Sequence, residues 1–389
     1  MRFSPLVDRV AGKGAGAWRV HFEAVRQRAH GRDIILLTVG DPDQAPPEPV
    51  IEATVAALRR HRTHYSPIVG YPELRAAVAA RVARRTGRLC SADNVVIVPG
   101  AQAGLYCALQ CIAGPGDEVV IPEPIYATYE AVVGASGARL VTVPLRPESG
   151  FHPELETIER ALTPRTRVVW INSPHNPTGA VLSASEIDAI AALCRRHALW
   201  LVSDEVYEDL SFTRPHASAW GRTEQSIVVS SLSKSHAIPG FRTGWIVAPP
   251  PLVAHLFNLV LCMLYGGPPF IQDGALAALV GDLPEVAALR EDYRRRAALL
   301  AGLLATAPNC RLTPPEGGMF LLLDVRGTGL DAEAFARGRL EREGVATLPC
   351  DGFGPSGAGQ LRISLAAPDG RLAEAGDRIL RFTRTLAAG

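Results

Sequence analysis

Short apolar runs alternate with longer helical patterns between about residues 90 and 250. Seven of these runs have the length and the flanking residues of buried strands. They are Val95–Val98, Glu118–Ile121, Leu140–Val143, Val168–Asn172, Trp200–Ser203, Ile227–Ser230 and Trp245–Ala248. Because strands and helices alternate, we expect a mostly parallel sheet with helices on both faces. Such sheets bind ligands at the carboxyl ends of their strands.

The pattern changes beyond residue 285. A long helical pattern over Glu285–Leu304 leads to the apolar run Met319–Asp324 and then to short strands that end near Ser364. A chain of 389 residues is too long for one compact core, so we expect two domains that share an interface. At the other end, Arg9–Trp18 is too rich in glycine to form a stable helix by itself.

Composition and charge narrow the class of protein. Hydrophobic residues make up 47% of the chain and charged residues 20%, as in ordinary soluble globular proteins. The formal net charge of +1 argues against a nucleic-acid partner or a membrane surface. The apolar stretch Leu252–Leu264 is interrupted by His255 and Asn258, and it is shorter than the roughly 20 apolar residues of a membrane span. The first residues lack the apolar core of a signal peptide.

The seven cysteines are scattered, odd in number and free of C-x-x-C pairs. This usage predicts reduced thiols in a cytoplasmic protein. Cys107 and Cys111 lie at helical spacing, but small buried apolar residues explain them better than metal ligands do. We therefore expect no metal site.

Lysine is almost absent from the chain. The sequence contains 38 arginines and only two lysines, Lys13 and Lys234. Arginine keeps its proton at any ordinary pH, whereas a lysine amine can lose its proton in a suitable pocket, attack a carbonyl and form a Schiff base. A surface lysine retained by chance is the alternative, but the scarcity favours a chemical role.

The neighbourhood of Lys234 indicates which carbonyl compound it meets. The apolar run Ile227–Val229 ends in serine hydroxyls, and Arg242 follows eight positions after the lysine, between two glycines. Hydroxyls and a guanidinium together bind a phosphate dianion well. An aldehyde cofactor that carries a phosphate and is held by a lysine is pyridoxal 5'-phosphate.

At this point the sequence resembles the class I/II aminotransferases, which are fold-type I pyridoxal-phosphate enzymes of the aspartate aminotransferase superfamily. Their S-x-S-K and R-x-G elements match Ser231, Ser233, Lys234, Arg242 and Gly244. The resemblance extends from about residue 36 to 366, with the motifs in family order. It implies an α/β fold with a seven-stranded, mostly parallel sheet in a large cofactor-binding domain (46–285). It also implies a small α+β domain (286–389), with residues 1–45 forming an N-terminal arm and part of the small domain.

The resemblance assigns further cofactor-binding residues. Gly100, Ala101 and Gln102 occupy the family's phosphate turn, between a strand and a helix over 105–112. Small residues there let backbone N–H groups approach an anion, although many strand-to-helix turns look alike. Tyr126, at the start of the next helix, matches the ring that stacks on the cofactor, while core packing is the simpler explanation for Tyr129.

Two more motifs follow strands. Asn172–Gly179 contains Asn176 between two prolines, which matches the family's donor to the cofactor's phenolic oxygen. His175 replaces an asparagine that is common in relatives, and a loop histidine with satisfied hydrogen bonds explains it better than a catalytic one. Asp204 ends a strand, where a buried carboxylate needs a partner such as a pyridinium nitrogen, and Tyr207 matches a second ligand of the phenolic oxygen.

The resemblance also implies substrate contacts and a homodimer. Arg362, in Leu361–Ser364, matches the arginine that clamps the substrate α-carboxylate. Gly40 matches the segment that crosses the site, and Trp18 either walls the pocket or packs the arm onto the body. Tyr65 matches a tyrosine that reaches the phosphate in the partner's active site, so the active unit would be a homodimer.

The implied reaction is transamination. Lys234 would act as general base at the amino-acid α-carbon while Asp204 stabilises the cofactor ring, and Asn176 would also contact substrate. Relatives specific for aspartate place a cation where Gln102 stands or on a partner loop, yet Leu259–Asp273 carries no basic residue. We therefore expect a basic or neutral donor, not an acidic one.

A finer resemblance is to arginine:pyruvate transaminases. It lies in Ala15–Trp18, Val39–Asp43, Ser173–Pro177, Ser231–His236 and Leu261–Gly266. It favours arginine as donor and pyruvate as acceptor, with Asp41 and Glu123 as candidate partners for a cationic side chain. Ile238–Phe241 departs from the family, whose members usually carry a threonine and a tryptophan there.

Several alternatives remain open from sequence. The enzyme could prefer aspartate or aromatic donors, or catalyse another pyridoxal-phosphate reaction such as β-elimination or oxidation. The chain could also be the cofactor-sensing domain of a transcription regulator, although such proteins carry a preceding DNA-binding domain. A binding protein with an inactive site is disfavoured by the intact lysine, aspartate, asparagine and two arginines.

Overall fold

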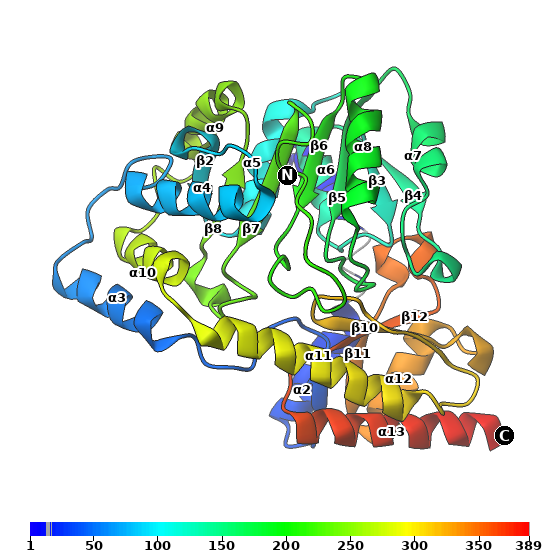
Figure 1. The fold of residues 1–389 in the computed structure, drawn as a ribbon. Helices are drawn as coiled ribbons and strands as arrows, with labels where there is room; N and C mark the ends of the chain where they lie inside the picture. Colours follow the sequence, from blue (N-terminus) through cyan, green and yellow to red (C-terminus); the bar gives the residue numbers. More distant parts are fainter. Residues whose placement is uncertain (13–15, 17, 389) are drawn as a thin grey trace.

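Two sheets organise the chain, which a computed structural model describes at residues 1–12, 16 and 18–388 (Figure 1). The larger sheet has the order β2-β8-β7-β6-β5-β3-β4. Its strands are β2 (Val95–Val98), β3 (Glu118–Glu123), β4 (Arg139–Pro144), β5 (Thr166–Asn172), β6 (Trp200–Asp204), β7 (Ser226–Ser231) and β8 (Gly244–Val247). Only β8 runs antiparallel to its neighbours. All seven predicted strands and the mostly parallel sheet are confirmed.

Helices cover both faces of this sheet because alternate strand residues point in opposite directions. In β7, Val228 packs in the core beneath α4, α7 and α8, whereas Ile227 and Val229 pack against α5, α6 and α9. The bounds are α4 (Pro72–Thr86), α5 (Ala101–Ile112), α6 (Tyr129–Ser136), α7 (Leu155–Ala161), α8 (Ala184–Arg196) and α9 (Pro250–Met263). Beside them, α3 (Glu48–Arg59) packs on α10 (Pro269–Val280).

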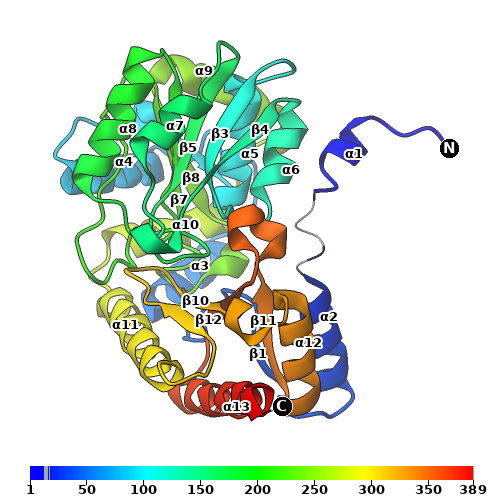
Figure 2. The ribbon, with the colours of Figure 1, turned by 90° about the vertical axis from the view of Figure 1, so that its right-hand side faces the viewer.

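The smaller sheet has the order β1-β11-β12-β10-β9 and lies below the larger one in Figures 1 and 2. Its strands are β1 (Ile35–Leu37), β9 (Arg311–Thr313), β10 (Phe320–Asp324), β11 (Val345–Pro349) and β12 (Gln360–Ser364). Around it lie α2 (Arg19–Ala29), α11 (Pro284–Leu304), α12 (Ala332–Glu343) and α13 (Asp369–Ala388), while the short α1 (Leu6–Arg9) contacts α6.

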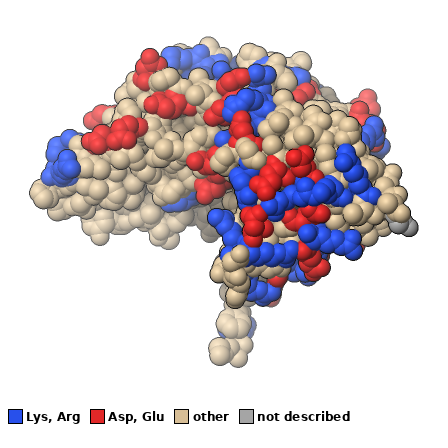
Figure 3. Space-filling view, turned by 90° about the horizontal axis from the view of Figure 1, so that it is seen from below, with Lys and Arg blue, Asp and Glu red and all other residues tan. Residues whose placement is uncertain are grey.

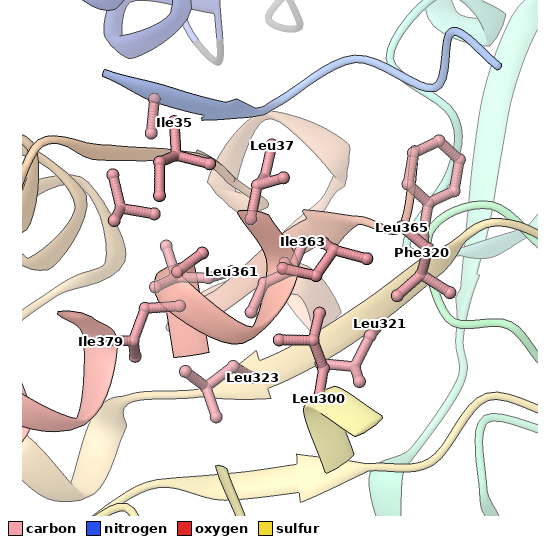
Figure 4. Packing of buried hydrophobic residues seen from close by; sticks show 14 of the residues in the cluster. Ile35, Leu37, Leu300, Phe320, Leu321, Leu323, Leu361, Ile363, Leu365 and Ile379 are labelled. Atoms are coloured by element: carbon pink, nitrogen blue, oxygen red, sulfur yellow. The ribbon is translucent and has the colours of Figure 1, made fainter. Parts of the chain in front are cut away.

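The smaller sheet has its own hydrophobic core (Figure 4). Ile35 and Leu37 of β1 pack with side chains of β10, β12, α11 and α13 in one buried cluster. Because β1 pairs in parallel with β11, the start of the chain belongs to the same sheet as its last third. The sequence-based division at residues 45 and 285 stays a prediction, and the helix predicted over Glu285–Leu304 is confirmed as α11.

The surface over α11 and α13 carries both signs of charge (Figure 3). Arg295 pairs there with Asp292 and Asp369, and Arg378 pairs with Asp33 and Glu374. Acidic and basic side chains are thus interspersed on this face, which offers no single-sign surface to a polyanion. Among the described residues, every helix is too short or too polar to cross a membrane.

Candidate active site

A pocket opens where β5, β6 and β7 end, between the two sheets. Thirteen residues predicted from sequence line it, and they come from both halves of the chain. They are Trp18, Gly40, Ala101, Gln102, Tyr126, Asn176, Asp204, Tyr207, Ser231, Ser233, Lys234, Arg242 and Arg362. Residues nearly 350 positions apart in the sequence therefore meet at one site, as the carboxyl ends of parallel strands predict.

Lys234 lies in the turn after β7 and reaches across to the N-terminal segment. Its Nζ donates a hydrogen bond to the backbone oxygen of Gly40 at 2.5 Å. Burial lowers the pKa of the amine to about 8; Asp41 opposes this shift, and the charges of Arg362 and Arg242 add to it. An amine with this pKa is partly neutral near pH 8, as a nucleophile or general base must be.

Asp204, at the end of β6, is buried and has no basic side-chain partner among the described residues. Burial raises the pKa of its carboxyl to about 6, although hydrogen bonds from the Tyr129 hydroxyl (2.7 Å) and the Val206 N–H (3.1 Å) work against the shift. Sequence reasoning assigned Tyr129 to core packing. Its ring does pack on Trp170, with centroids 4.3 Å apart, but its hydroxyl also positions the aspartate. No local pattern in the sequence indicated this second role, because the two residues lie 75 positions apart.

An anion cradle lies at the start of α5. Gly100, with φ of 86°, precedes the helix, and a Cβ there would lie 2.4 Å from Nη2 of Arg242. Glycine is required because the guanidinium occupies that space. Arg242 is held by the carbonyls of Pro239 (2.8 Å) and Pro99 (3.1 Å), and the buried hydroxyls of Ser231 and Ser233 line the same pocket. A helix N-terminus, a guanidinium and two hydroxyls form a phosphate site.

The helix behind this cradle begins earlier than predicted. The sequence pattern suggested a helix over 105–112, but α5 starts at Ala101. The small residues Ala101, Ala103 and Gly104 let the first turn pack closely: a Cβ on Gly104 would lie 2.8 Å from the Val229 side chain. The free N–H groups of the first turn therefore lie beside Ala101 and Gln102, where the phosphate turn was expected.

Arg362 is the second guanidinium of the pocket, and it is 1% exposed. It donates to Oδ1 of Asn176 at 2.9 Å and to the backbone oxygen of Thr38 at 2.7 Å, and it stacks on Phe320 at 4.0 Å. Its Nε has no partner among the described groups. The bond to Asn176 holds the amide oxygen and leaves its N–H groups available as donors, so the guanidinium orients this side chain.

Aromatic side chains form the walls. Tyr126 and Tyr207 line the pocket, and burial raises the pKa of both hydroxyls. Tyr126 was expected at the start of a helix, but α6 begins only at Tyr129, after a turn closed by the bond from Tyr129 N–H to the Tyr126 oxygen. Trp18 lines the mouth and packs on the cluster that includes Phe353, so it both walls the pocket and anchors its segment.

Three other candidates lie outside this lining. Tyr65 is 83% exposed and stacks on Tyr265, with centroids 4.9 Å apart. Glu123 was a candidate for the pocket mouth, but it is 4% exposed, accepts a hydrogen bond from Ser356 and does not line the pocket. Asp41 is exposed and directly follows Gly40, so it is the better-placed acid.

His175 is a buried loop histidine, as the sequence favoured. Its Nδ1 lies 2.8 Å from the Thr178 hydroxyl, and burial lowers the pKa of the ring to about 3. Elsewhere, Glu205, Glu208 and His216 form the one group in the described part of the chain that is close enough to share a metal ion. Arg81 already pairs with Glu208, which leaves less charge for a cation.

These groups fit pyridoxal 5'-phosphate. The cradle suits its phosphate, Lys234 suits its aldehyde, and the buried Asp204 lacks the cation that a pyridinium nitrogen provides. The seven cysteines are all free, so the site does not depend on a disulfide.

Comparison with known proteins agrees with this chemistry. The family model for aminotransferase class I and II matches residues 32–379. An arginine–pyruvate transaminase from Pseudomonas aeruginosa is 48% identical over 97% of both chains. An aspartate/prephenate aminotransferase from Thermus thermophilus is 34% identical over 95% of this chain and 96% of its own. The structure of a Thermus thermophilus aspartate aminotransferase with maleate superposes with a TM-score of 0.93 at 34% identity, and it covers 98% of this chain and 100% of its own.

Proposed function

The chain belongs to the class I and II aminotransferases, which are pyridoxal-phosphate-dependent enzymes of fold type I, and from this membership we propose that it transfers the α-amino group of arginine to pyruvate. The observation that carries the choice of substrates is the 48% identity to an arginine–pyruvate transaminase over 97% of both chains. The relatives named for aspartate are more distant, at 30–34% identity.

The residues that bind the cofactor follow from the pocket. Arg242, Ser231, Ser233 and the first turn of α5 would hold the phosphate, Asp204 would pair with the ring nitrogen, and Tyr126 would pack on the ring. Asn176 and Tyr207 would contact the phenolic oxygen. When bound, pyridoxal phosphate supplies an electron sink beside the substrate α-carbon.

The remaining groups act on the substrate. Arg362 would bind the α-carboxylate with the nitrogen that has no partner and with those now bonded to Thr38 and Asn176. Lys234 would take the proton from the α-carbon of the substrate and hold it on Nζ, a role for which a pKa near 8 is suited. Trp18 and Gly40 would exclude water from the mouth.

The charge of the pocket supports a donor without a second carboxylate. In the described part of the chain, the basic side chains that line it are Lys234, Arg242 and Arg362. The phosphate would engage Arg242 and the α-carboxylate Arg362, which leaves no cation for an acidic side chain. Asp41, in contrast, lies beside the mouth and offers a carboxylate to a guanidinium.

A donor screen tests the proposal. With pyruvate as acceptor, we expect kcat/KM for arginine to exceed that for aspartate by about 100-fold, because the side-chain carboxylate of aspartate would leave water without gaining a cation and would face the like charge of Asp41. The measurement is coupled detection of alanine, with alanine, aspartate and aromatic donors tested against 2-oxoglutarate in parallel. Strong turnover of aspartate without turnover of arginine would show that the donor is acidic and would refute the proposed substrate. Product formation without an oxo-acid acceptor would show that the enzyme catalyses another reaction of the same cofactor and not transamination.

We also propose that the enzyme is a homodimer in which Tyr65 completes the partner's phosphate site. The ring is exposed beside Tyr265, and Phe257 and Met263 are also exposed on the adjacent α9. Tyr65→Phe should weaken cofactor binding about tenfold, the effect of one hydrogen bond to a charged group. Mixing this variant with Lys234→Ala should restore one intact site in each mixed dimer. If the mixture bound the cofactor as weakly as Tyr65→Phe alone, contact across subunits would be refuted. A monomer in sedimentation velocity would refute it as well.

A further inference from the structure

His152 bridges two carboxylates outside the pocket. It precedes α7, and its Nδ1 lies 2.7 Å from Glu186 of α8, while its Nε2 lies 3.2 Å from Glu316 in the connection between β9 and β10. All three side chains are only 20–27% exposed. A neutral imidazole donates from one nitrogen only, so two carboxylate acceptors are satisfied together only by the imidazolium.

The charges around this bridge also require a cation at His152. Glu316 accepts from Arg214 at 3.1 Å, and Glu186 accepts from the Ser183 N–H at 2.7 Å in the cap of α8. The two carboxylates are thus balanced by one guanidinium and one imidazolium. The nearby His175 is buried and neutral, so it supplies no charge.

Glu316 is the point where the segment 314–319 attaches to the loop between β5 and α8. Its carboxylate accepts from the Val181 N–H at 2.9 Å, and the N–H groups of Glu316 and Gly317 both donate to the Gly179 oxygen at 2.9 Å. The contact is close, because a Cβ on Gly179 would lie 2.4 Å from the Pro315 side chain. This loop continues from Asn176, so the segment is joined to a residue of the pocket.

The same segment is joined to the turn after Tyr207 and leads directly into the substrate clamp. Gly318 N–H donates to the Leu210 oxygen at 2.8 Å, and Phe212 N–H donates to the Glu316 oxygen at 2.8 Å. Phe320 then opens β10 and lies 4.0 Å beneath the guanidinium of Arg362. A shift of the segment would move the floor on which Arg362 rests.

We propose that His152, as the imidazolium, is a positioning residue that acts through Glu316: it fixes the segment 314–319 and so holds Phe320 beneath Arg362 in the geometry that binds the substrate carboxylate. Loss of the ring proton leaves a lone pair facing one carboxylate. The shorter Nδ1 bond to Glu186 is kept, and the longer one to Glu316 is lost. The kinetic part of this inference rests on the proposed transamination, whereas the titration of His152 does not.

Titration of His152 tests the bridge without cofactor or substrate. The hydrogen bond to Glu186 raises the pKa of the ring above its ordinary value of 6.5, and the charges of Glu186 and Glu316 add to the shift. The stabilisation by the bridge is complete below pH 6.5 and is lost as the pH rises through the raised pKa. NMR of histidine Cε1–H groups, assigned with His152→Gln, should find this pKa above 6.5 and nearer to 6.5 in Glu316→Gln. A wild-type value of 6.5 or less would overturn the proposal.

Steady-state kinetics test the positioning role. In the wild type, KM for the amino donor should rise as His152 loses its proton. In His152→Gln, KM should be about tenfold higher at low pH and should no longer follow this titration, with kcat within about twofold, because one charge-assisted hydrogen bond is lost away from the reacting atoms.

Two further variants separate charge from structure. His152→Lys keeps a cation with three donors at any working pH, so KM should stay low across the range. His197→Gln removes a histidine that faces one exposed carboxylate, Glu159, at 3.7 Å, and should leave KM unchanged. A wild-type KM profile in His152→Gln would refute the positioning role. Absence of transamination in every variant and in the wild type would refute the proposed function, while the titration result would stand.

Discussion

Replacing Lys234 with alanine is expected to reduce turnover by at least about 10⁴-fold, because in the proposed mechanism one amine would serve as both covalent anchor and proton carrier. Its position supports both roles: it lies in the pocket, reaches Gly40 at 2.5 Å and has a pKa lowered to about 8. The rate should be measured by rapid quench with saturating donor and cofactor, so that weak binding is not mistaken for slow chemistry.

The covalent attachment of the cofactor to Lys234 can also be tested without measuring a rate. After treatment with borohydride, mass spectrometry should find the cofactor attached to the peptide that contains Lys234. The peptide that contains Lys13, the only other lysine and one outside the described residues, is the internal control. Lys234→Ala should retain no attached cofactor. Attachment at Lys13, or full turnover by the variant, would contradict the assignment.

Replacing Arg362 with methionine is the second change with a large expected effect. Removing a desolvated charge partner of a carboxylate costs about 2–5 kcal/mol, so kcat/KM for the donor should fall roughly 10²–10³-fold, mainly through KM. Stability should change little, because Arg362 is buried without a carboxylate partner among the described residues and an apolar side chain removes that desolvation cost. The loss of its bonds to Asn176 and Thr38 offsets this gain.

Arg339 offers a matched control in the same small sheet region. It is fully buried, donates to the Val345 oxygen at 3.2 Å and to Thr347, and lies outside the pocket lining. Arg339→Met should therefore leave kcat/KM unchanged, whatever it does to the melting temperature. If both variants lost the same activity, or if Arg362→Met kept the wild-type KM, the clamp would not be Arg362.

The larger sheet could be predicted from sequence because its signal is local. Each of β2–β8 is a short apolar run between turn residues, and the predicted bounds differ from the observed ones by no more than two residues. Asp204, Ser231 and Lys234 could be placed because they lie at or just after strand ends, whereas Arg362 lies inside β12. The starts of helices were less predictable. Helix α5 begins at Ala101 in a stretch with small residues, and α6 begins at Tyr129 after a turn, and neither feature produces a periodic hydrophobic pattern.

Contacts between distant residues could not be predicted. Nothing in the sequence places the Tyr129 hydroxyl on Asp204, 75 positions away, or the Arg362 guanidinium on Asn176, 186 positions away. The bridge from His152 to Glu316 spans 164 positions. The first bond depends on how α6 packs on the larger sheet, and the other two depend on how the two sheets are placed relative to each other. Residue patterns within a window of ten or twenty positions contain no information about that packing.

The pairing of β1 with β11 has a consequence for the order in which the enzyme is made. Ile35 lies opposite Val345, so the first strand synthesised has no neighbour until about three hundred more residues have left the ribosome. The seven-stranded sheet, complete by Val247, can form during that interval, whereas Ile35 and Leu37 stay unburied. The nascent chain therefore exposes an unpaired apolar strand throughout most of translation. We expect chaperones that bind unfolded chains to bind this strand during that time.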